Sequence, residues 1–258
     1  MYKVLNIMLD FLHQTFDIYS LIAIAGFTLI TSAIHGATGV AGGFLLSAVL
    51  ASIIGVKPIV PVMSVALLIS HSSRVFLNSA HFDKKAFFSV IKTAVPCIIL
   101  AALFYGRLSS FSIALILGFV ILMSIPLRRW AKKQEIKASS KTLSSVGTVY
   151  GALSGVSVGP GLLLAPFLLG HGLSRQAFVV TLAAIALITN ITRLSVFGFD
   201  NLLSTNYIIL GVLIGVFTIP GNWIGRSYLR KMSNENHSSF VDVLTVLGAM
   251  NMFWVAFK

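Results

Sequence analysis

The chain has 258 residues, of which 57% are hydrophobic and only 10% are charged, and its mean hydropathy is +0.94. Soluble globular domains carry roughly 25% charged residues, so this composition excludes an ordinary soluble domain and indicates a membrane protein. The net charge of +12 is confined to loops, which is typical of the positive-inside distribution of membrane proteins and argues against a nucleic-acid partner.

Nine apolar segments follow one another along the chain, and several reach the roughly 20 residues that a helix needs to cross about 30 Å of hydrocarbon. The short alternating segments of a membrane barrel are absent from the sequence. We therefore predict an all-α polytopic membrane protein with about eight membrane helices. The segments are 18–35, 44–56, 59–80, 86–105, 110–127, 143–171, 176–198, 205–225 and 239–257.

The N-terminal stretch does not read as a signal peptide, because Asp10 and Asp17 interrupt it and no small-residue cleavage site follows. We expect it to lead into a retained helix. The single cysteine, Cys97, has no partner for an internal disulfide and no companion for a metal site. Neither a metal nor a cofactor is expected.

One long central loop, residues 128–141, collects much of the positive charge. Lysine and arginine gather on the cytoplasmic side of membrane proteins, so this loop is expected to be cytoplasmic in a protein of the cytoplasmic membrane. Counting crossings outward from the loop places both termini outside. Its basic residues are Arg128, Arg129, Lys132, Lys133, Lys137 and Lys141.

The two halves of the chain resemble each other in sequence. The segment "GATGVAGGFLLSAVLASIIGVKP" at 36–58 is matched by "GALSGVSVGPGLLLAPFLLGHGLS" at 151–174. The polar signature "SHSSR" at 70–74 is matched by "TNITR" at 189–193. Counterparts are about 116 to 119 residues apart, so we predict an internal duplication.

The predicted organisation is a first repeat at 1–127, a basic cytoplasmic linker at 128–142 and a second repeat at 143–258. Lys84 and Lys85 follow the first polar signature on the inside, whereas the counterpart loop at 198–204 has no positive charge and is expected outside. Equivalent helices then point in opposite directions. Secondary transporters are commonly built from such inverted repeats, with the substrate near the midplane between them.

The glycine-rich stretches interrupt otherwise apolar segments. Residues 143–156 and 159–172 are each about 14 residues long, or about 21 Å as a helix, with glycine and proline at the kink between them. Two short crossings fit this pattern, and so does one hairpin that turns at mid-membrane and returns. Non-helical backbone cannot face lipid, because each unpaired N–H or C=O group costs several kcal/mol. We favour paired re-entrant hairpins that enter from opposite faces.

A turn at membrane depth presents free N–H groups and positive helix ends, which suit a small anion. Glycine lets a ligand approach the backbone, and the hydroxyls of Thr38, Ser154 and Ser157 can add donors. The alternative is that these glycines only allow close helix packing, which also explains "GVLIG" at 211–215 and "GNWIG" at 221–225. The candidate tip residues are Thr38, Gly39, Gly42, Gly43, Gly155, Ser157 and Gly159.

Arg74 and Arg193 occupy matching positions in the two halves. A charged side chain near the bilayer centre costs at least about 2.5–3.5 kcal/mol on insertion scales, so such a residue needs a reason. Contact with an anion, a tie to backbone carbonyls and snorkelling are the three alternatives, and the symmetric placement favours anion contact. Polar neighbours that would share the lining are Ser70, His71, Ser73, Thr189, Asn190 and Thr192.

His35 and His71 are the other titratable residues expected to lie deep in the membrane. All acidic residues fall near segment ends or in loops, so a carboxylate proton relay is not supported. Proton coupling would more naturally use a histidine, which titrates near neutral pH, although a hydrogen-bonded packing role is the common alternative. The acidic residues are Asp10, Asp17, Asp83, Glu135, Asp200, Glu235 and Asp242.

The motif "GVSVG" at 155–159 matches the nucleophile elbow of soluble hydrolases. That motif needs a strand before its serine and an acid–histidine pair after it. The context here is a membrane hairpin, so we expect no catalytic role for Ser157 and no enzyme.

With these residues identified, the chain resembles the sulfite exporter TauE/SafE family of membrane permeases. The two glycine-rich segments and the polar helices through Arg74 and Arg193 carry the resemblance, which covers about residues 15–257. The first repeat departs from the usual pattern, because "AGGFLLSA" lacks a proline. The resemblance implies transport of small anions, such as sulfite, sulfoacetate or related sulfonates.

The leading hypothesis is therefore a permease that binds a small anionic substrate near the midplane of the lipid bilayer. The alternative is a non-transporting membrane scaffold or assembly protein, whose function would depend on the basic loop at 128–141.

Overall fold

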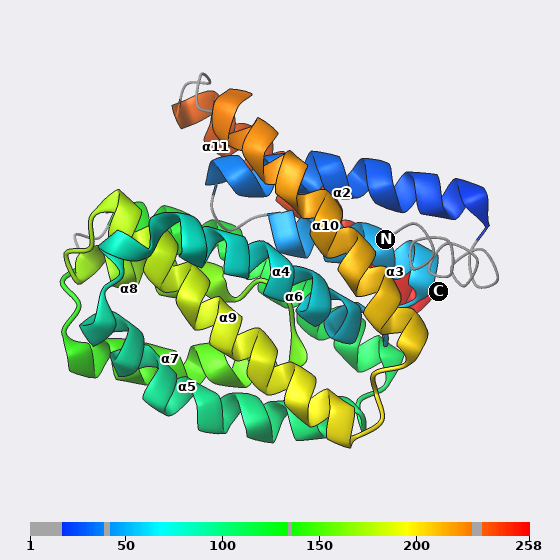
Figure 1. Ribbon diagram of the computed structural model, residues 1–258, viewed down its shortest axis with the longest axis horizontal. Coiled ribbons are helices and arrows are strands. Elements are labelled where there is room, and N and C mark those ends of the chain that lie inside the picture. Colours follow the sequence, from blue (N-terminus) through cyan, green and yellow to red (C-terminus); the bar gives the residue numbers. More distant parts are fainter. Residues whose placement is uncertain (1–16, 39–41, 134–135, 229–233) are drawn as a thin grey trace.

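The computed structural model describes residues 17–38, 42–133, 136–228 and 234–258, and within these ranges the chain is helical without a strand (Figure 1). The prediction of an all-α fold is confirmed for this part of the chain. The elements are α2 (Ile18–Thr38), α3 (Gly42–Ile54), α4 (Ile59–Asn78), the 3₁₀ turn η1 (Ser79–His81), α5 (Lys84–Tyr105), α6 (Ser110–Lys133), α7 (Ser140–Val156), α8 (Gly161–Gly170), α9 (Arg175–Phe199), α10 (Thr205–Tyr228) and α11 (Asn234–Phe257).

Six of the described helices are long and apolar enough to cross a membrane, namely α2, α4, α5, α6, α9 and α10. This is fewer than the predicted number because α3, α7 and α8 contain only 13, 17 and 10 residues. Large apolar side chains such as Phe76, Phe104 and Trp223 lie exposed on the outer surface, as expected for helices that face lipid. The chain is a multi-pass membrane protein.

The central basic stretch is not wholly a loop, which corrects the sequence-based expectation for residues 128–141. Helix α6 continues to Lys133, and α7 already begins at Ser140. Ser139 starts α7 with a reciprocal capping box, because its side chain accepts from the amide of Thr142 and the Thr142 side chain accepts from the amide of Ser139. The sequence of this region is polar enough to leave the membrane but still favours helix.

Helices α7 and α8 form a hairpin whose open ends lie together. The amide of Ala138, just before α7, donates to the carbonyl of Gly170 at the end of α8 at 3.0 Å. The His171 ring also contacts the carbonyl of Ala138, with Nδ1 at 2.7 Å. Gly159 turns the chain at the other end of the hairpin with φ of +94°, a conformation that glycine adopts without strain.

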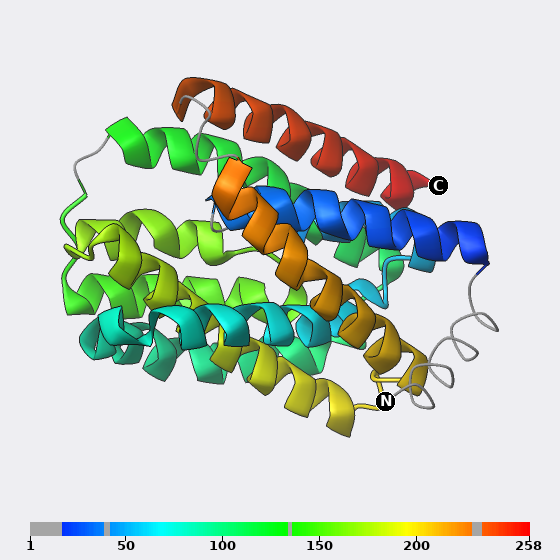
Figure 2. The same ribbon diagram turned by 45° about the horizontal axis from the view of Figure 1, so that its top comes forward.

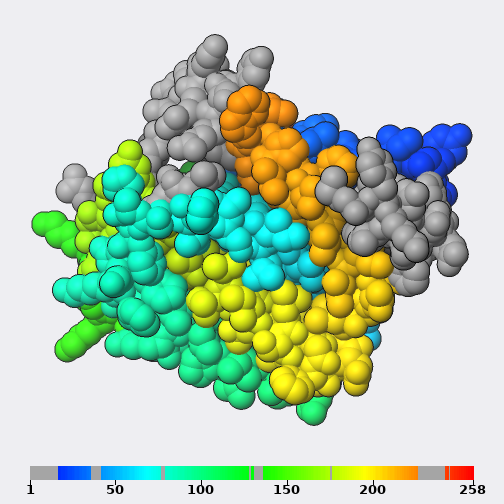
Figure 3. Space-filling view, in the orientation of Figure 1, coloured from blue at the N-terminus to red at the C-terminus, as the bar shows by residue number. Residues whose placement is uncertain are grey.

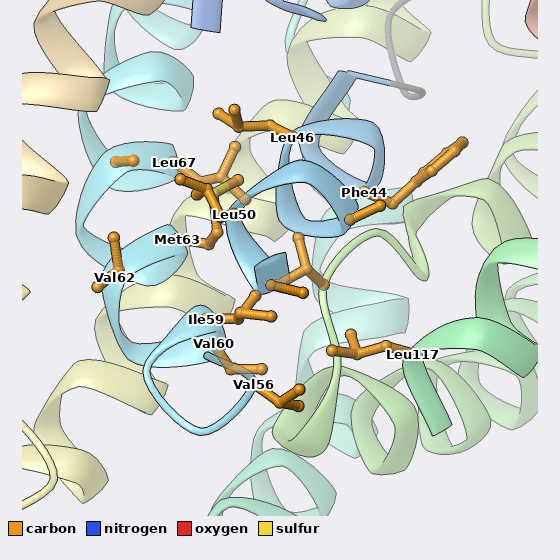
Figure 4. Close-up of a cluster of buried hydrophobic side chains, with 14 of the residues drawn as sticks. Phe44, Leu46, Leu50, Val56, Ile59, Val60, Val62, Met63, Leu67 and Leu117 are labelled. Atoms are coloured by element: carbon orange, nitrogen blue, oxygen red, sulfur yellow. The ribbon is translucent and has the colours of Figure 1, made fainter. Parts of the chain in front are cut away.

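Helix α3 begins directly against the last turns of α2. A Cβ atom at Gly42 would collide with the carbonyl of Thr31 and with the side chain of His35. The absence of a side chain at this position therefore permits the close approach of α3 to α2. Figure 4 shows α3 and α4 side chains packed together, with Phe44, Leu50, Ile59 and Met63 almost fully buried.

Glycines on one face of α7 allow it to lie close along α5 in a parallel direction. Gly147, Gly151 and Gly155 approach the backbone of α5 near Val90, Ala94 and Ile98, one helical turn further for each glycine. Helix α10 uses Gly211 and Gly215 against α4 and Gly221 and Gly225 against α2 in the same manner. The packing role proposed for "GVLIG" and "GNWIG" therefore agrees with their surroundings.

Replacing Gly151 with valine is expected to force α7 away from α5, because even a Cβ there would lie 2.8 Å from the Ala94 Cα. Overpacking of this kind costs about 1–3 kcal/mol and more where backbone must move. Thermal unfolding of the purified protein in detergent should show a clear fall in Tm. Ala152→Val, on the exposed face of the same turn, is the matched control and should leave Tm nearly unchanged.

Four helices, α4, α5, α9 and α10, lie side by side on one face of the molecule (Figure 3). Helices α6 and α11 pack together along another edge (Figure 2). The α4–α9 contact lies within the first group and brings the two polar signatures of the sequence together.

Candidate functional site

Arg193, on α9, is buried and holds the end of α7 in place. Its guanidinium donates to the carbonyls of Ser154 at 3.0 Å and Ser157 at 2.8 Å. It also donates to the side-chain oxygen of Asn190, one turn earlier on the same helix. Only 3% of Arg193 is exposed, so the snorkelling alternative does not describe its position.

Arg74, on α4, makes the corresponding contact in the first half of the chain. It donates to the carbonyl of His35, near the end of α2, at 3.0 Å. Both His35–Arg74 and Ser154–Arg193 are 39 residues apart in the sequence. Arg74 therefore ties α4 to the last turn of α2, and Arg193 ties α9 to the end of α7.

A cavity of about 60 Å³ lies between these two arginines and is lined by both halves of the chain. At about 10–15 Å³ for each water-sized group, it has room for a few waters or a small anion. Its polar wall is contributed by α2, α4, α7 and α9. The polar residues that line it are His35, His71, Arg74, Tyr150, Ser154, Thr189, Asn190 and Arg193.

Several buried polar atoms on this wall have no hydrogen-bond partner among the described residues. They are both ring nitrogens of His35, Nδ1 of His71, Nε of Arg193 and Oγ of Ser154. The two histidine rings lie edge to face with their centroids 6.0 Å apart. Buried polar groups are normally paired, so a cluster of unpaired nitrogen atoms around a cavity points to a ligand or water that completes them.

The glycine-rich tips supply the backbone part of the lining. Gly43, at the start of α3, and Gly159 and Gly161, at the turn into α8, border the cavity. The start of a helix exposes N–H groups and carries partial positive charge of about +0.5. Together with the arginines, these elements make the cavity electrostatically positive. Among the described residues that line it, none is acidic.

Comparison with protein-family models matches residues 23–252 to the family described as "Sulfite exporter TauE/SafE". The chain belongs to the sulfite exporter TauE/SafE family. The match confirms the resemblance inferred from the sequence. Members of this family are membrane transporters and not enzymes. Searches of curated proteins and of solved structures each found no match.

In this member of the TauE/SafE family, several predicted site residues gather at the cavity and others do not. Ser70 lies beside it, in a much smaller void of about 10 Å³ shared with His35, Gly42 and Gly43. Its hydroxyl accepts a hydrogen bond from Asn222 of α10 at 3.1 Å. The predicted residues that line the main cavity are His35, Gly43, His71, Arg74, Gly159, Thr189, Asn190 and Arg193.

The remaining predicted residues have other surroundings. The hydroxyls of Ser73 and Thr192 donate to carbonyls of their own helices, Ser70 and Ile188, and neither residue lines the cavity. Gly155 packs against α5 instead, because a Cβ there would lie 2.8 Å from the carbonyl oxygen of Ile98. The Thr38 side chain and Gly39 lie outside the described residues.

Ser157 contributes backbone rather than a nucleophile. Its hydroxyl donates to the carbonyl of Leu153 at 2.7 Å, and its own carbonyl accepts from Arg193. The residue is fully buried at the C-terminal end of α7. The hydrolase motif therefore lies in the helix-to-turn context expected of a membrane hairpin, not in a strand–turn–helix elbow.

Tyr150 lines the cavity but was not identified from the sequence, whereas Ser154, which the sequence suggested as a hydroxyl donor, also lines it. The Tyr150 hydroxyl lies 2.9 Å from the hydroxyl of Thr189 and so joins α7 to α9. Ser154 precedes Arg193 by the same interval as His35 precedes Arg74, so the repeat also indicates its place beside the arginine. The repeat does not indicate Tyr150 in the same way. The two arginines are 119 residues apart, and the residue 119 positions before Tyr150 is Thr31, which is not aromatic.

No group of three or more histidine, cysteine, aspartate or glutamate side chains suited to a metal ion occurs within the described ranges of the chain. The two cavity histidines therefore lack the third ligand that a typical protein metal site would need.

Proposed function

We propose that this TauE/SafE transporter is a permease of small anions, with sulfite or an organosulfur or other organic anion as the substrate. The substrate would bind in the cavity between Arg74 and Arg193, near the midplane of the membrane. The observation that carries this proposal is the pair of arginines, each bonded to a helix end, on either side of a cavity with unpaired nitrogen atoms.

The chemistry of the wall favours an anion over a cation or a neutral solute. Two guanidinium groups contribute positive charge without a carboxylate among the described lining residues. Nε of Arg193 is an N–H donor with no partner, and a neutral histidine offers one N–H donor as well. A tetrahedral or pyramidal oxyanion could accept several of these hydrogen bonds at once, and charge-assisted bonds are the stronger ones.

An inverted repeat would place this site between two equivalent halves. The contacts between helices support the repeat. Each helix has a counterpart whose number is five higher or lower, such as α2 and α7 or α5 and α10, and counterpart helices make equivalent contacts. Helix α5 packs on α7 as α10 packs on α2, and α10 packs on α4 as α5 packs on α9. Two further contacts, α4 with α9 and α6 with α11, each join a helix to its own counterpart.

The directions of the helices support inversion rather than simple duplication. Helix α7 runs parallel to α5, and α2 runs parallel to α10, as the order of their glycine contacts indicates. In Figure 1, α2 and α10 run from right to left, whereas α5 and α7 run from left to right. The end of α5 lies beside the turn before α10, since a Cβ at Gly106 would contact Leu202 at 3.4 Å.

These directions fit re-entrant hairpins that enter the membrane from opposite faces. The open end of the α7–α8 hairpin lies at the face where α5 begins, and α2 would enter from the face where α5 ends. With the positive-inside rule, the α7–α8 hairpin would open to the cytoplasm and the α2–α3 hairpin to the outside. Both termini would then lie outside, and the basic linker inside the cell.

His35 and His71 are the candidates for proton coupling in this proposal. Their rings lie together beside the substrate cavity and keep unpaired nitrogen atoms. Protonation of either ring would add positive charge next to an anion, so proton and anion binding would favour each other. Asn190 would contribute a side-chain amide to the same substrate.

Counterflow in proteoliposomes tests the proposed function. Vesicles loaded with unlabelled sulfite should accumulate labelled sulfite in a saturable manner, and short organosulfonates or carboxylates should compete according to their affinity. Thermal unfolding in detergent with the same anions gives an independent readout, because a ligand of the folded state raises Tm. An absence of saturable exchange and of any Tm shift would contradict the permease proposal.

The same measurements separate the permease from a scaffold. A non-transporting assembly protein would show no exchange, and its cellular function would depend on the basic linker. If the chain is a permease, replacing the exposed Lys137 and Lys141 with uncharged residues should instead leave counterflow intact.

A further inference from the structure

A second cavity, of about 210 Å³, lies on the outer side of the α7–α8 hairpin. One wall is α6, and the other is the hairpin, from the end of α7 through the turn to the start of α8. Phe119 and Met123 of α6 are about half exposed at its edge, so it is open to the surroundings of the protein. The lining residues are Phe119, Val120, Met123, Ser124, Leu127, Leu153, Gly159, Pro160, Leu162 and Leu163.

In the other half of the chain, α11 takes the place of α6 and packs directly on α3. There Asn251 donates to the carbonyl of Ala48 on α3 at 2.6 Å. The Asn251 side chain also bonds with the hydroxyl of Ser52, and a Cβ at Gly248 would lie 3.4 Å from that of Ala48. Beside the α7–α8 hairpin, the space next to α6 is instead left open.

The wall of this groove is almost wholly apolar. The hydroxyl of Ser124 is already bonded to the carbonyl of Ile121 at 2.6 Å and so adds no free polar group. The groove also borders the backbone turn at Gly159 and Pro160, whose carbonyls already accept hydrogen bonds from the amides of Leu162 at 3.4 Å and Leu163 at 2.9 Å. An alkyl chain can therefore lie against this wall without leaving these carbonyls unpaired.

Positive charge lies at the end of the groove toward the basic linker. Leu127 is the last lining residue of α6, whereas Arg129, two residues further, is paired with Asp242 of α11 at 2.8 Å and is not counted toward the groove. Lys137 and Lys141 are exposed before and at the start of α7, at the open end of the hairpin that forms the opposite wall. Trp130, 48% exposed, has the amphipathic character of residues at the membrane–water interface.

We infer that the groove between α6 and the α7–α8 hairpin is a binding site for an anionic phospholipid. One acyl chain lies along α6 from Leu127 toward Phe119, against the outer side of the hairpin turn. The phosphate group lies beside Lys137 and Lys141, because basic residues at the ends of membrane helices recognise anionic headgroups. Since Gly159 and Pro160 border both cavities, the lipid supports the wall of the central cavity from behind.

The test compares the phospholipid retained by the purified full-length protein and by two tryptophan variants, using native mass spectrometry. Leu163→Trp fills the groove, and we expect it to lower phospholipid retention roughly tenfold. Leu100→Trp, on α5 where Leu100 is 60% exposed to the surroundings, is the matched control and should retain phospholipid as the wild type does. Equal retention by Leu163→Trp would overturn the proposal.

Headgroup selectivity is tested by adding lipid to the delipidated wild-type protein. Phosphatidylglycerol should raise Tm more than phosphatidylcholine, because the anionic lipid binds the folded state more tightly. The double variant Lys137→Gln, Lys141→Gln should lose this difference. Equal stabilisation by both lipids, or recovery of a neutral lipid or a quinone as the retained molecule, would contradict an anionic phospholipid. The wild-type measurement remains decisive if Leu163→Trp fails to fold.

Discussion

Replacing Arg193 with alanine is expected to abolish anion flux and to lower stability as well. The guanidinium is buried and bonded to two backbone carbonyls and to Asn190. Each buried acceptor left without its donor costs about 1–3 kcal/mol. Loss of a charged hydrogen bond to the substrate, worth about 1.5–3 kcal/mol, would weaken anion binding about 10- to 100-fold.

Binding and structural roles of Arg193 are separated by a second substitution. Arg193→Lys keeps the positive charge but loses the planar fork that spans two carbonyls. We expect it to lose stability as the alanine variant does, yet to retain part of the Tm shift produced by sulfite. If Arg193 were purely structural, sulfite affinity per folded molecule would be the same in Arg193→Ala, Arg193→Lys and the wild type.

Arg74 provides the comparison between the two halves. We expect Arg74→Ala to reduce flux as strongly as Arg193→Ala, because both side chains border the same cavity. Normal counterflow with Arg74→Ala, in protein that is present in the membrane, would remove this residue from the proposed site.

Replacing Gly42 with alanine is expected to be the most damaging change in the first hairpin. The added Cβ would collide with the carbonyl of Thr31 and with His35, so α3 would have to move away from α2. A shift of backbone in a well-packed region costs about 1–3 kcal/mol or more. His35 belongs to the cavity wall, so we expect both Tm and counterflow to fall.

Gly26→Ala is the matched control for this substitution. It lies on α2, and a Cβ there would meet nothing within 4 Å. Alanine in a helix is more favourable than glycine by roughly 0.5–1 kcal/mol, so Tm should stay constant or rise. If Gly42→Ala behaved in the same way as Gly26→Ala, the close approach of α3 to α2 would not be a requirement of the fold.

The sequence alone was sufficient for the class of protein and for most of its apolar helices, but not for the basic stretch at 128–141, which is largely helical. Asp83, Ser139 and Ser174 each cap the helix that follows, because each accepts a hydrogen bond from a backbone amide three residues later. The family followed from the glycine-rich segments and the two arginines. Local signals of this kind depend on neighbours in sequence, so they can be read without the fold.

The glycines show where sequence reading reached its limit. Gly155 and Gly159 stand four residues apart in one motif, yet one packs against α5 and the other borders the central cavity. Their difference depends on which helix lies opposite each one. Likewise, Arg193 and Arg74 could be assigned to a deep pair from their positions, but not to the carbonyls of Ser154 and His35.

Composition and hydropathy therefore determined that this chain is a helical membrane protein, because burial in lipid constrains every residue of a crossing helix, and the resemblance of its glycine-rich segments indicated the TauE/SafE family. Only the tertiary structure decided which polar groups meet at one cavity and that a groove lies between α6 and the α7–α8 hairpin. Those features arise from contacts between segments distant in sequence, such as α4 with α9 and α6 with α8, whose geometry no local pattern encodes.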